Sequence, residues 1–188
     1  MSAAALLAPQ PGERVLDLCA APGTKTTHLA ELMNGEGSIV ATDVDLGRLR
    51  RIEENADRLG FSSMIEPLVI REDLSELPQG PFNAILIDVP CSNTGVLGKR
   101  PEVRSRITPE DIDELVVTQQ KLLGAAASLV APGGRIVYST CSVEPEENSG
   151  VVTQFLQKSS DFELVETHNF IPGNPTDGGY QVLLKRTT

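Results

Sequence analysis

The sequence predicts an α/β protein built on a doubly wound, seven-stranded sheet that is mostly parallel and has an antiparallel last strand. Short apolar runs alternate with helical patterns along the 188 residues, and this alternation is typical of sheets with helices on both faces. The apolar runs are continuous, as expected for strands buried on both sides. The last two runs are too close in sequence for a helix between them, so we expect the final strand to run antiparallel.

Four strands and two helices are expected in the first half of the chain. The apolar start, 1–12, is interpreted as a helix end and a connector. A long amphipathic helix is expected to begin after Asp45, which caps it, and to end at Gly60. Pro67 lacks a backbone donor and indicates an edge strand, whereas 82–88 is apolar throughout and indicates a central one. The predicted strands are 14–19, 38–43, 65–70 and 82–88, and the predicted helices are 24–33 and 46–59.

Two helices and three strands are expected in the second half. Thr108, followed by Pro109 and two acidic residues, predicts a helix start. This helix is expected to run to about Val130, where A-P-G-G stops it. Pro145, with glutamates on both sides, predicts a second helix that runs to about Lys158. The predicted strands are 135–140, 162–167 and 180–185.

The composition is that of a single globular domain, 1–188. Hydrophobic residues make up 40% of the chain and charged residues 22%, which is ordinary for a globular protein of this size. No apolar run approaches the roughly 18 residues of a membrane span. The start has no basic flank and no clear cleavage site, so we expect neither membrane insertion nor secretion.

The cysteines indicate the compartment and argue against a metal centre. Cys19, Cys91 and Cys141 are odd in number and too sparse for a disulfide framework, which favours a reducing cytoplasm. The sequence has no C-x-x-C pair and only 2 histidines. We therefore expect no metal site.

The distribution of charge points in two directions. A net charge of −10 argues against a general nucleic-acid binder, because phosphates attract clustered cations. The cations are unevenly placed, however, and one cluster follows the strand at 82–88. The cluster is either a solvated loop or a local contact to RNA phosphates, and it consists of Lys99, Arg100, Arg104 and Arg106.

The loop after the first strand, D-L-C-A-A-P-G-T-K-T at 17–26, has the features of a cofactor site. In such sheets ligands bind beyond the carboxyl ends of the strands, and small residues let them approach the backbone. The glycine spacing of a phosphate loop and of a dinucleotide fingerprint is missing. Asp43, at the end of the second strand, suits a ribose diol, and Asp73 could contact a base. We therefore expect S-adenosylmethionine (SAM), with Lys25 near its carboxylate.

Three acidic or thiol side chains near this loop also have a purely structural interpretation. Asp17 ends a strand and could serve the fold alone. Asp73 could cap its own loop. Cys19 taken by itself is typical of a small buried apolar residue.

Three segments of the chain are similar to known signatures. They are D-L-C-A-A-P-G-x-K-T from 17, D-V-P-C-S-x-T-G-V from 88 and Y-S-T-C-S-V-x-P-E-E-N from 138. Together, and in this order and spacing, they resemble the RNA cytosine-5 methyltransferases of the NOL1/NOP2/Sun (Fmu/RsmB-like) family. The resemblance implies a class I SAM-dependent methyltransferase fold and methyl transfer from SAM to C5 of a cytosine in RNA. It favours rRNA and leaves tRNA open.

The same resemblance implies roles for three residues of these segments. Cys141 is the nucleophile, Cys91 assists breakdown of the covalent adduct, and Asp88 contacts the target cytosine beside the cofactor. The chemistry needs both thiols, because thiolate addition at C6 makes C5 nucleophilic and the C6–S bond must later break. The predicted cofactor-binding residues are Cys19, Ala20, Ala21, Pro22, Gly23, Thr24, Lys25, Asp43, Asp73 and Asp88, and the predicted RNA-binding residues are Lys99, Arg100, Arg104 and Arg106.

The chain departs from the family pattern at several places, and two other functions stay open. Thr24 and Asn93 stand where small residues are usual, and 99–106 lacks the usual tryptophan and histidine. The upstream RNA-binding regions of many members are absent, so we expect a catalytic core.

The alternatives are an inactive SAM-binding factor in RNA or ribosome assembly, and a SAM enzyme for DNA or a small molecule. DNA cytosine enzymes use the P-C cysteine as nucleophile, so the T-C motif favours RNA. The oligomeric state is not indicated.

Overall fold

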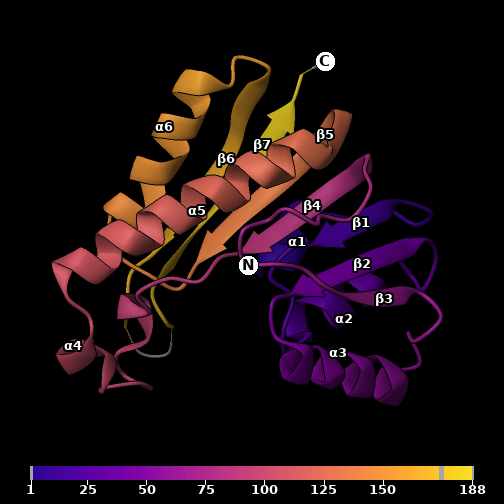
Figure 1. Cartoon of the computed structure of the whole chain (residues 1–188), viewed down its shortest axis with the longest axis horizontal. Coiled ribbons are helices and arrows are strands. Elements are labelled where there is room, and N and C mark those ends of the chain that lie inside the picture. Colours follow the sequence, from indigo (N-terminus) through magenta and orange to yellow (C-terminus); the bar gives the residue numbers. More distant parts are fainter. Residues whose placement is uncertain (1, 174–175, 188) are drawn as a thin grey trace.

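A single twisted sheet organises the chain, whose computed structural model describes residues 2–173 and 176–187. Its seven strands have the order β3-β2-β1-β4-β5-β7-β6, and Figure 1 shows them crossing the whole molecule. This mixed, mainly parallel sheet confirms the predicted fold class. The strands are β1 (Arg14–Asp17), β2 (Ser38–Asp43), β3 (Ile65–Val69), β4 (Phe82–Asp88), β5 (Val130–Thr140), β6 (Phe162–Phe170) and β7 (Gly179–Arg186).

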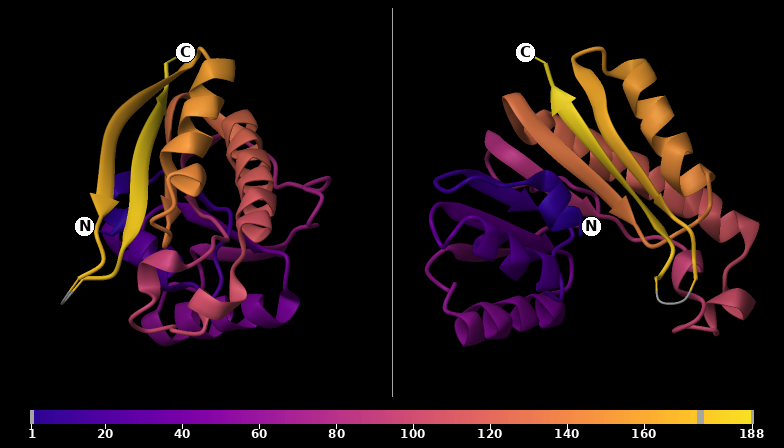
Figure 2. Two further views of the ribbon diagram at one scale, coloured as in Figure 1. Left: turned by 90° about the vertical axis from the view of Figure 1, so that its left-hand side faces the viewer. Right: turned by 180° about the vertical axis from the view of Figure 1, so that it is seen from behind.

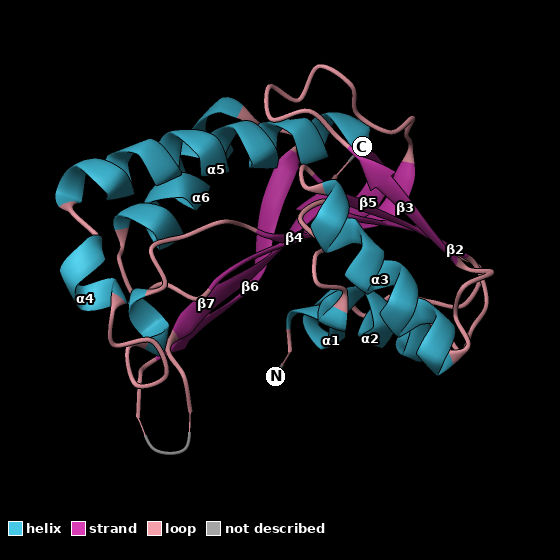
Figure 3. Ribbon diagram, turned by 60° about the horizontal axis from the view of Figure 1, so that its bottom comes forward, coloured by secondary structure: helices cyan, strands magenta, loops and turns pink. Residues whose placement is uncertain are grey.

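Helices cover both faces of the sheet. Helices α1, α2 and α3 lie on one face, and α5 and α6 lie on the other, as Figures 1 and 3 show. The short α4 lies beyond the end of the sheet, next to the start of α5. The helices are α1 (Ala3–Leu7), α2 (Thr24–Leu32), α3 (Leu46–Leu59), α4 (Val103–Arg106), α5 (Pro109–Leu129) and α6 (Val151–Lys158). A 3₁₀ turn at Thr94–Val96 and a π-helical turn at Glu146–Gly150 complete the described elements.

Two buried clusters hold the helices to the sheet, because successive strand residues point to opposite faces. On β4, Ile85 and Ile87 pack into the cluster that contains Leu123 of α5. Ala84 and Leu86 of the same strand pack into the cluster beneath α1, α2 and α3. A strand buried on both sides reads as a continuous apolar run, which explains why the sequence pattern identified β4.

The last two strands reverse direction. β7 runs antiparallel to β5 on one side and to β6 on the other, and Figure 2 shows the resulting hairpin along one edge of the sheet. This arrangement confirms the predicted antiparallel final strand. Among the described strands, β3 forms the opposite edge and pairs only with β2, as Pro67 indicated.

Helix boundaries agree with the capping residues in the sequence. α3 has the predicted bounds, with the Asp45 carboxylate accepting from Arg48 N at 3.0 Å and Gly60 as a left-handed C-cap. α5 begins at Pro109 behind a capping box in which Thr108 and Asp111 bond reciprocally. The helix predicted after Pro145 exists, although its first turn is π-helical.

The predicted end of β1, start of β5 and end of β6 were wrong, the last because β6 continues to Phe170, and one short helix was not predicted. The first strand stops at Asp17 because the next carbonyl, that of Leu18, accepts a hydrogen bond from the Thr42 hydroxyl and the chain turns into the loop. A-P-G-G does not separate a helix from a strand, because Val130 already pairs with Phe82 and the register shift before Ala84 accommodates these residues. α4 was not predicted, since four residues are too few for a periodic pattern.

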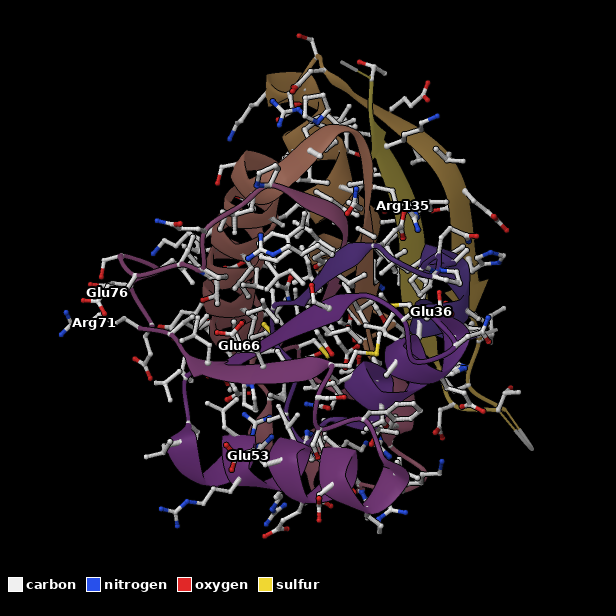
Figure 4. The ribbon with its side chains drawn as sticks, turned by 90° about the vertical axis from the view of Figure 1, so that its right-hand side faces the viewer. Glu36, Glu53, Glu66, Arg71, Glu76 and Arg135 are labelled. Carbon is white, nitrogen blue, oxygen red and sulfur yellow. The ribbon has the colours of Figure 1, made fainter. Side chains whose placement is uncertain are left out.

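The β3 side of the sheet, remote from α4, carries exposed charged side chains of both signs. In Figure 4 Glu53 on α3, Glu66 on β3 and Glu76 after β3 extend outward on this side. Glu76 accepts from Arg71 at 3.3 Å in an exposed ion pair. Acidic residues also occur at the start of α5, next to α4, so the negative charge is not confined to this side. Within the described residues no helix is long and apolar enough to cross a membrane.

Candidate active site

The loops that follow β1, β4 and β5 meet at one end of the sheet, where the carboxyl ends of these strands lie. These strands are parallel neighbours in the order β1-β4-β5, so their carboxyl ends lie side by side. Lys25 follows β1, Cys91 follows β4 and Cys141 follows β5. The strand order reverses between β1 and β4, and open α/β sheets bind ligands at such a switch point. The prediction that both cysteines leave neighbouring strands is confirmed.

Two cysteine thiols are in contact at the carboxyl ends of these strands. Sγ of Cys91 lies 3.2 Å from Sγ of Cys141, and both residues are free thiols. The hydrogen bond from Cys91 holds the pKa of Cys141 below its usual value, against the effect of burial. Donation of that hydrogen bond, together with burial, raises the pKa of Cys91. The pair is thus polarised, with Cys141 the easier thiol to ionise and Cys91 a retained proton donor.

An ion pair lies beside the cysteines. Nζ of Lys25 donates to Oδ2 of Asp88 at 2.5 Å, and about two thirds of each side chain is buried. Burial acts against the charge of Lys25, but the Asp88 carboxylate outweighs it and the pKa of Lys25 is raised. The lysine thus contacts the carboxylate that ends β4. The pairing of Lys25 with the cofactor carboxylate remains a prediction.

A buried carboxylate ties the two cysteine loops together. Glu147 is fully buried, and its carboxylate accepts from Ser92 N at 2.9 Å, from the Ser92 hydroxyl at 2.5 Å and from Gln119 at 2.9 Å. Ser92 Oγ also lies 3.0 Å from Oγ of Ser142. Because Ser92 follows Cys91 and Ser142 follows Cys141, this cluster fixes both thiols relative to each other. We call Ser92, Gln119, Ser142 and Glu147 the Glu147 clamp.

Close backbone contact adds to this fixation at Gly95. Its N–H donates to the carbonyl of Cys141 at 2.9 Å, and its own carbonyl accepts from Gly178 N at 2.8 Å. A Cβ at this position would lie 2.8 Å from the Cys141 carbonyl oxygen. Only glycine allows the loop after β4 to approach the Cys141 loop this closely.

The loop after β1 forms a narrow cradle. Ala20 and Ala21 are buried, and Gly23 starts α2 in the left-handed region at φ 98°. A Cβ on Gly23 would meet the backbone of Ile52 on α3 at 3.1 Å. Thr24 is exposed at the first position of α2. The small residues therefore serve both the packing of α2 on α3 and the approach of a ligand.

Asp17 places an unpaired oxygen under the cradle. Its side chain is fully buried, Oδ2 accepts from the Thr26 hydroxyl at 2.7 Å, and Oδ1 has no partner among the described residues. Burial raises the pKa of Asp17 to about 7. A buried acceptor without a donor is costly, and a bound cationic group would remove that cost. Asp17, whose role the sequence left open, is therefore a candidate for a cofactor contact.

Asp17→Asn is expected to remove part of the pH dependence of stability. A carboxyl whose pKa is higher in the folded chain stabilises it below pH 4, and this contribution is lost as the pH rises to about 7. Relative to wild type, the free energy of unfolding of Asp17→Asn should rise between pH 4 and pH 8 by at most about 4 kcal/mol. Urea denaturation of both proteins without cofactor measures this difference. A difference that does not change with pH would contradict the raised pKa.

The other predicted cofactor residues differ in their environment. Asp43 is buried and accepts from Ala21 N at 3.3 Å and Asp45 N at 3.1 Å, with Arg48 3.5 Å away. Asp73 is exposed and accepts from the backbone and hydroxyl of Ser75, as expected of a loop cap. These bonds lower the pKa of Asp73. Cys19 is partly buried against the α5 side of the sheet, and burial raises its pKa. Its contact with a cofactor remains a prediction.

The basic cluster lies beside the cysteines, on the turn and short helix that precede α5. Lys99 pairs with Asp177 at 2.6 Å, and the described ion pairs include none for the three arginines, which are exposed. A cavity of about 410 Å³ opens between this region and α5. It is lined by Cys91, Arg106, Ile107, Asp111, Glu114, Leu115 and Thr118. A cavity of this size accepts a nucleoside-sized group. Within the described residues no cluster of metal ligands occurs.

Comparison with known protein families shows to which family the chain belongs. The family model of the 16S rRNA methyltransferase RsmB/F matches residues 4–182. The chain belongs to this family. The family is one of SAM-dependent methyltransferases, which confirms the predicted class of fold and cofactor. The resemblance found in the three sequence motifs is confirmed as well.

Relatives of this RsmB/F-family chain include both curated proteins and solved structures. It is 43% identical to Ribosomal RNA small subunit methyltransferase B of Erwinia tasmaniensis over 95% of its own length and 40% of that protein. The crystal structure of PH0851 matches with a TM-score of 0.93 and 39% identity, covering 98% of this chain and 45% of that one. NSun6 from Pyrococcus horikoshii with SFG matches with a TM-score of 0.88 and 31% identity, covering 99% and 51%. The chain thus spans about 40% of the length of the curated relatives.

Several residues of this site had no assigned role in the sequence. Glu147 and Ser142 belong to a quoted motif, but the acidic run had been interpreted only as a helix start. Arg48 donates to the Ala21 carbonyl at 3.0 Å and so supports the cradle from α3. Asn93 had been noted only as a departure from the family pattern. Of these residues, Glu147 and Ser142 had a sequence signal, because both lie in the family motif that begins at 138.

Proposed function

We propose that the chain is the catalytic domain of an rRNA cytosine-5 methyltransferase in which Cys141 is the nucleophile and Cys91 assists release. The observation that carries the proposal is the 3.2 Å contact between two thiols beside Asp88. One thiol is polarised toward ionisation and the other retains its proton. Curated relatives are named rRNA small subunit methyltransferases, which supports rRNA as the substrate class.

The residues after β1 fit the predicted cofactor. The cradle has no Cβ at Gly23, and the unpaired oxygen of Asp17 suits a cationic amine. Asp43, at the end of β2, would hold the ribose, and Ala20 to Gly23 would line the methionine. Bound SAM supplies an electrophilic methyl group on a sulfonium. Asp88 would lie between cofactor and base, because it ends the strand next to β1.

Cys141 activates the target base. Its thiolate adds to C6 of the cytosine, so the C6–S bond forms and the electron pair of the 5,6 double bond makes C5 nucleophilic. The Asp88 carboxylate accepts a hydrogen bond from the N4 amino group and holds the ring. Lys25, bonded to Asp88 at 2.5 Å, fixes that carboxylate and brings a positive charge near the thiolate. Lys25 is one of the groups that lower the pKa of Cys141.

Cys91 then assists the break of the covalent bond. The H5 proton leaves to water, its electron pair restores the 5,6 double bond, and the pair of the C6–S bond returns to the Cys141 sulfur. Cys91 donates a hydrogen bond to that sulfur and stabilises it as a leaving group. Without this donor the adduct should persist. The raised pKa of Cys91 fits a thiol that stays protonated throughout.

The basic cluster brings the RNA to the thiols. Arg100, Arg104 and Arg106 would contact backbone phosphates, and the cavity beside Cys91 would receive a nucleotide that has left its stack. Few phosphate contacts are available, so the affinity of this chain for RNA should be low and should fall steeply with salt.

Methyl transfer to small-subunit rRNA tests the proposal. The chain is incubated with rRNA that lacks modifications and with SAM carrying a labelled methyl group, and digested nucleosides are separated. We expect label in 5-methylcytidine. Label in another nucleoside would overturn the cytosine-5 assignment. Binding of SAM without transfer to rRNA, tRNA or DNA would support a non-catalytic factor.

A further inference from the structure

Asn93 joins the two cysteine loops through its side chain. Its Nδ2 donates to the carbonyl of Cys91 at 2.8 Å, and its Oδ1 accepts from Sγ of Cys141 at 3.0 Å. The residue has a left-handed backbone with φ 63°, which directs the carboxamide back over the turn. Asparagine tolerates this conformation better than most residues. The side chain is half-buried and lies against the thiol that we propose as the nucleophile.

The orientation of the carboxamide follows from its partners. The Cys91 carbonyl can only accept, so the amide nitrogen must face it and the oxygen must face Cys141. A chain of hydrogen bonds results, from Cys91 to Cys141 and from Cys141 to Asn93. The Asn93 oxygen accepts a hydrogen bond from the Cys141 thiol but cannot accept one from the thiolate, so it favours the protonated form of Cys141. Cys91 has the opposite preference, because its donated hydrogen bond favours the thiolate.

We propose that Asn93 is a positioning residue that aims the Cys141 sulfur and retains its proton until the target base enters. The inference rests on the proposed function of Cys141. Two neighbours act on one thiol in opposite directions, so ionisation is balanced. A target cytosine that displaces the Asn93 oxygen from the thiol lets the thiol proton pass to water and leaves the Cys91 hydrogen bond in place. The small residue usual at this position in the family cannot supply such an acceptor.

The effect of Asn93 on Cys141 can be tested separately from that of the charged groups nearby. Besides Cys91 and Asn93, Cys141 is influenced by Asp88 and Lys25, which act in opposite directions. Neither contacts Asn93 in the described hydrogen bonds. Changes at Asn93 therefore alter the acceptor at the Cys141 thiol and the donor to the Cys91 carbonyl, and leave the pair of Asp88 and Lys25 in place. Asn93→Gly removes the side chain and tolerates the positive φ, so it is a cleaner variant than alanine.

The test is the pH profile of alkylation of the free protein by iodoacetamide. Each cysteine falls in its own tryptic peptide, 15–25, 72–99 or 136–158, so mass spectrometry reports Cys141 separately. We expect the midpoint for Cys141 in Asn93→Gly to fall by roughly half a pH unit, because one hydrogen bond to the thiol is lost. Asn93→Asp adds a negative charge beside the sulfur and should raise the midpoint. The plateau rate at high pH reports any change in access.

Activity completes the test. Methyl transfer by Asn93→Gly should fall roughly tenfold in kcat because the sulfur is less well aimed, with the KM for SAM unchanged. Equal midpoints in wild type, Asn93→Gly and Asn93→Asp would overturn the proposal, whatever the activities. SAM binding by each variant shows that it is folded, and the nearly isosteric aspartate keeps the test valid if glycine unfolds the chain. Lack of methyl transfer by wild type would instead contradict the proposed function, and the alkylation result would stand.

Discussion

Replacement of Cys141 by alanine is expected to abolish methyl transfer while leaving the fold and the cofactor site intact. Without the C6–S bond, C5 of cytosine does not become nucleophilic, so the rate should fall by at least about 10³-fold. The side chain lies at the surface of the site and is not part of the two buried clusters. The measurement is the single-turnover rate of label transfer from SAM to rRNA at saturating SAM.

Binding of SAM is the control for Cys141→Ala. Calorimetry should give the same affinity as for wild type, because the cradle lies after β1 and the nucleophile after β5. Cys141→Ser keeps the shape and should be nearly as inactive, since a hydroxyl at neutral pH is a far weaker nucleophile than a thiolate. Full activity of either variant would show that another group attacks the base.

Cys91→Ala is expected to trap the enzyme on its RNA. Removal of the donor 3.2 Å from the Cys141 sulfur leaves that sulfur a poorer leaving group. The methylated adduct should therefore accumulate to a large fraction of the enzyme within one turnover, and multiple turnover should stop. Denaturing gels resolve this species as a slow band that contains both protein and RNA and carries the labelled methyl group.

Two matched variants decide between a missing donor and a damaged loop. Cys91→Ser retains a hydrogen-bond donor and should form less adduct than Cys91→Ala. The double variant with Cys91→Ala and Cys141→Ala should form none, because the band requires the nucleophile. An active Cys91→Ala protein that turns over without a slow band would contradict the role in release.

The architecture follows from the sequence because its signals are local. Continuous apolar runs marked β2 and β4, Asp45 and Gly60 delimited α3, and Pro67 indicated the edge position of β3. The start of β5 could not be read in this way. A-P-G-G is typical of a helix stop, but the ladder to Phe82 draws Val130 into the sheet. Pairing across the sheet overrode the local preference there.

The identities of the site residues were easier to predict than their connections. The motifs indicated Asp88, Cys91 and Cys141, and the strand order explains why they meet. The Glu147 clamp and the bonds of Asn93 depend on side chains from loops distant in sequence, and sequence patterns do not encode such pairing. Asp17 shows the same limit, because its unpaired oxygen and raised pKa arise from burial under the folded cradle.

The identity of the cysteine that bonds to the base is the most direct test of the mechanism. RNA containing 5-fluorocytosine at the target position blocks the loss of the C5 substituent and traps the covalent complex after methyl transfer. Digestion with ribonuclease and trypsin, followed by mass spectrometry, locates the modified peptide. We predict the nucleotide on peptide 136–158, which contains Cys141. A nucleotide on peptide 72–99, which contains Cys91, would contradict the assignment of the nucleophile.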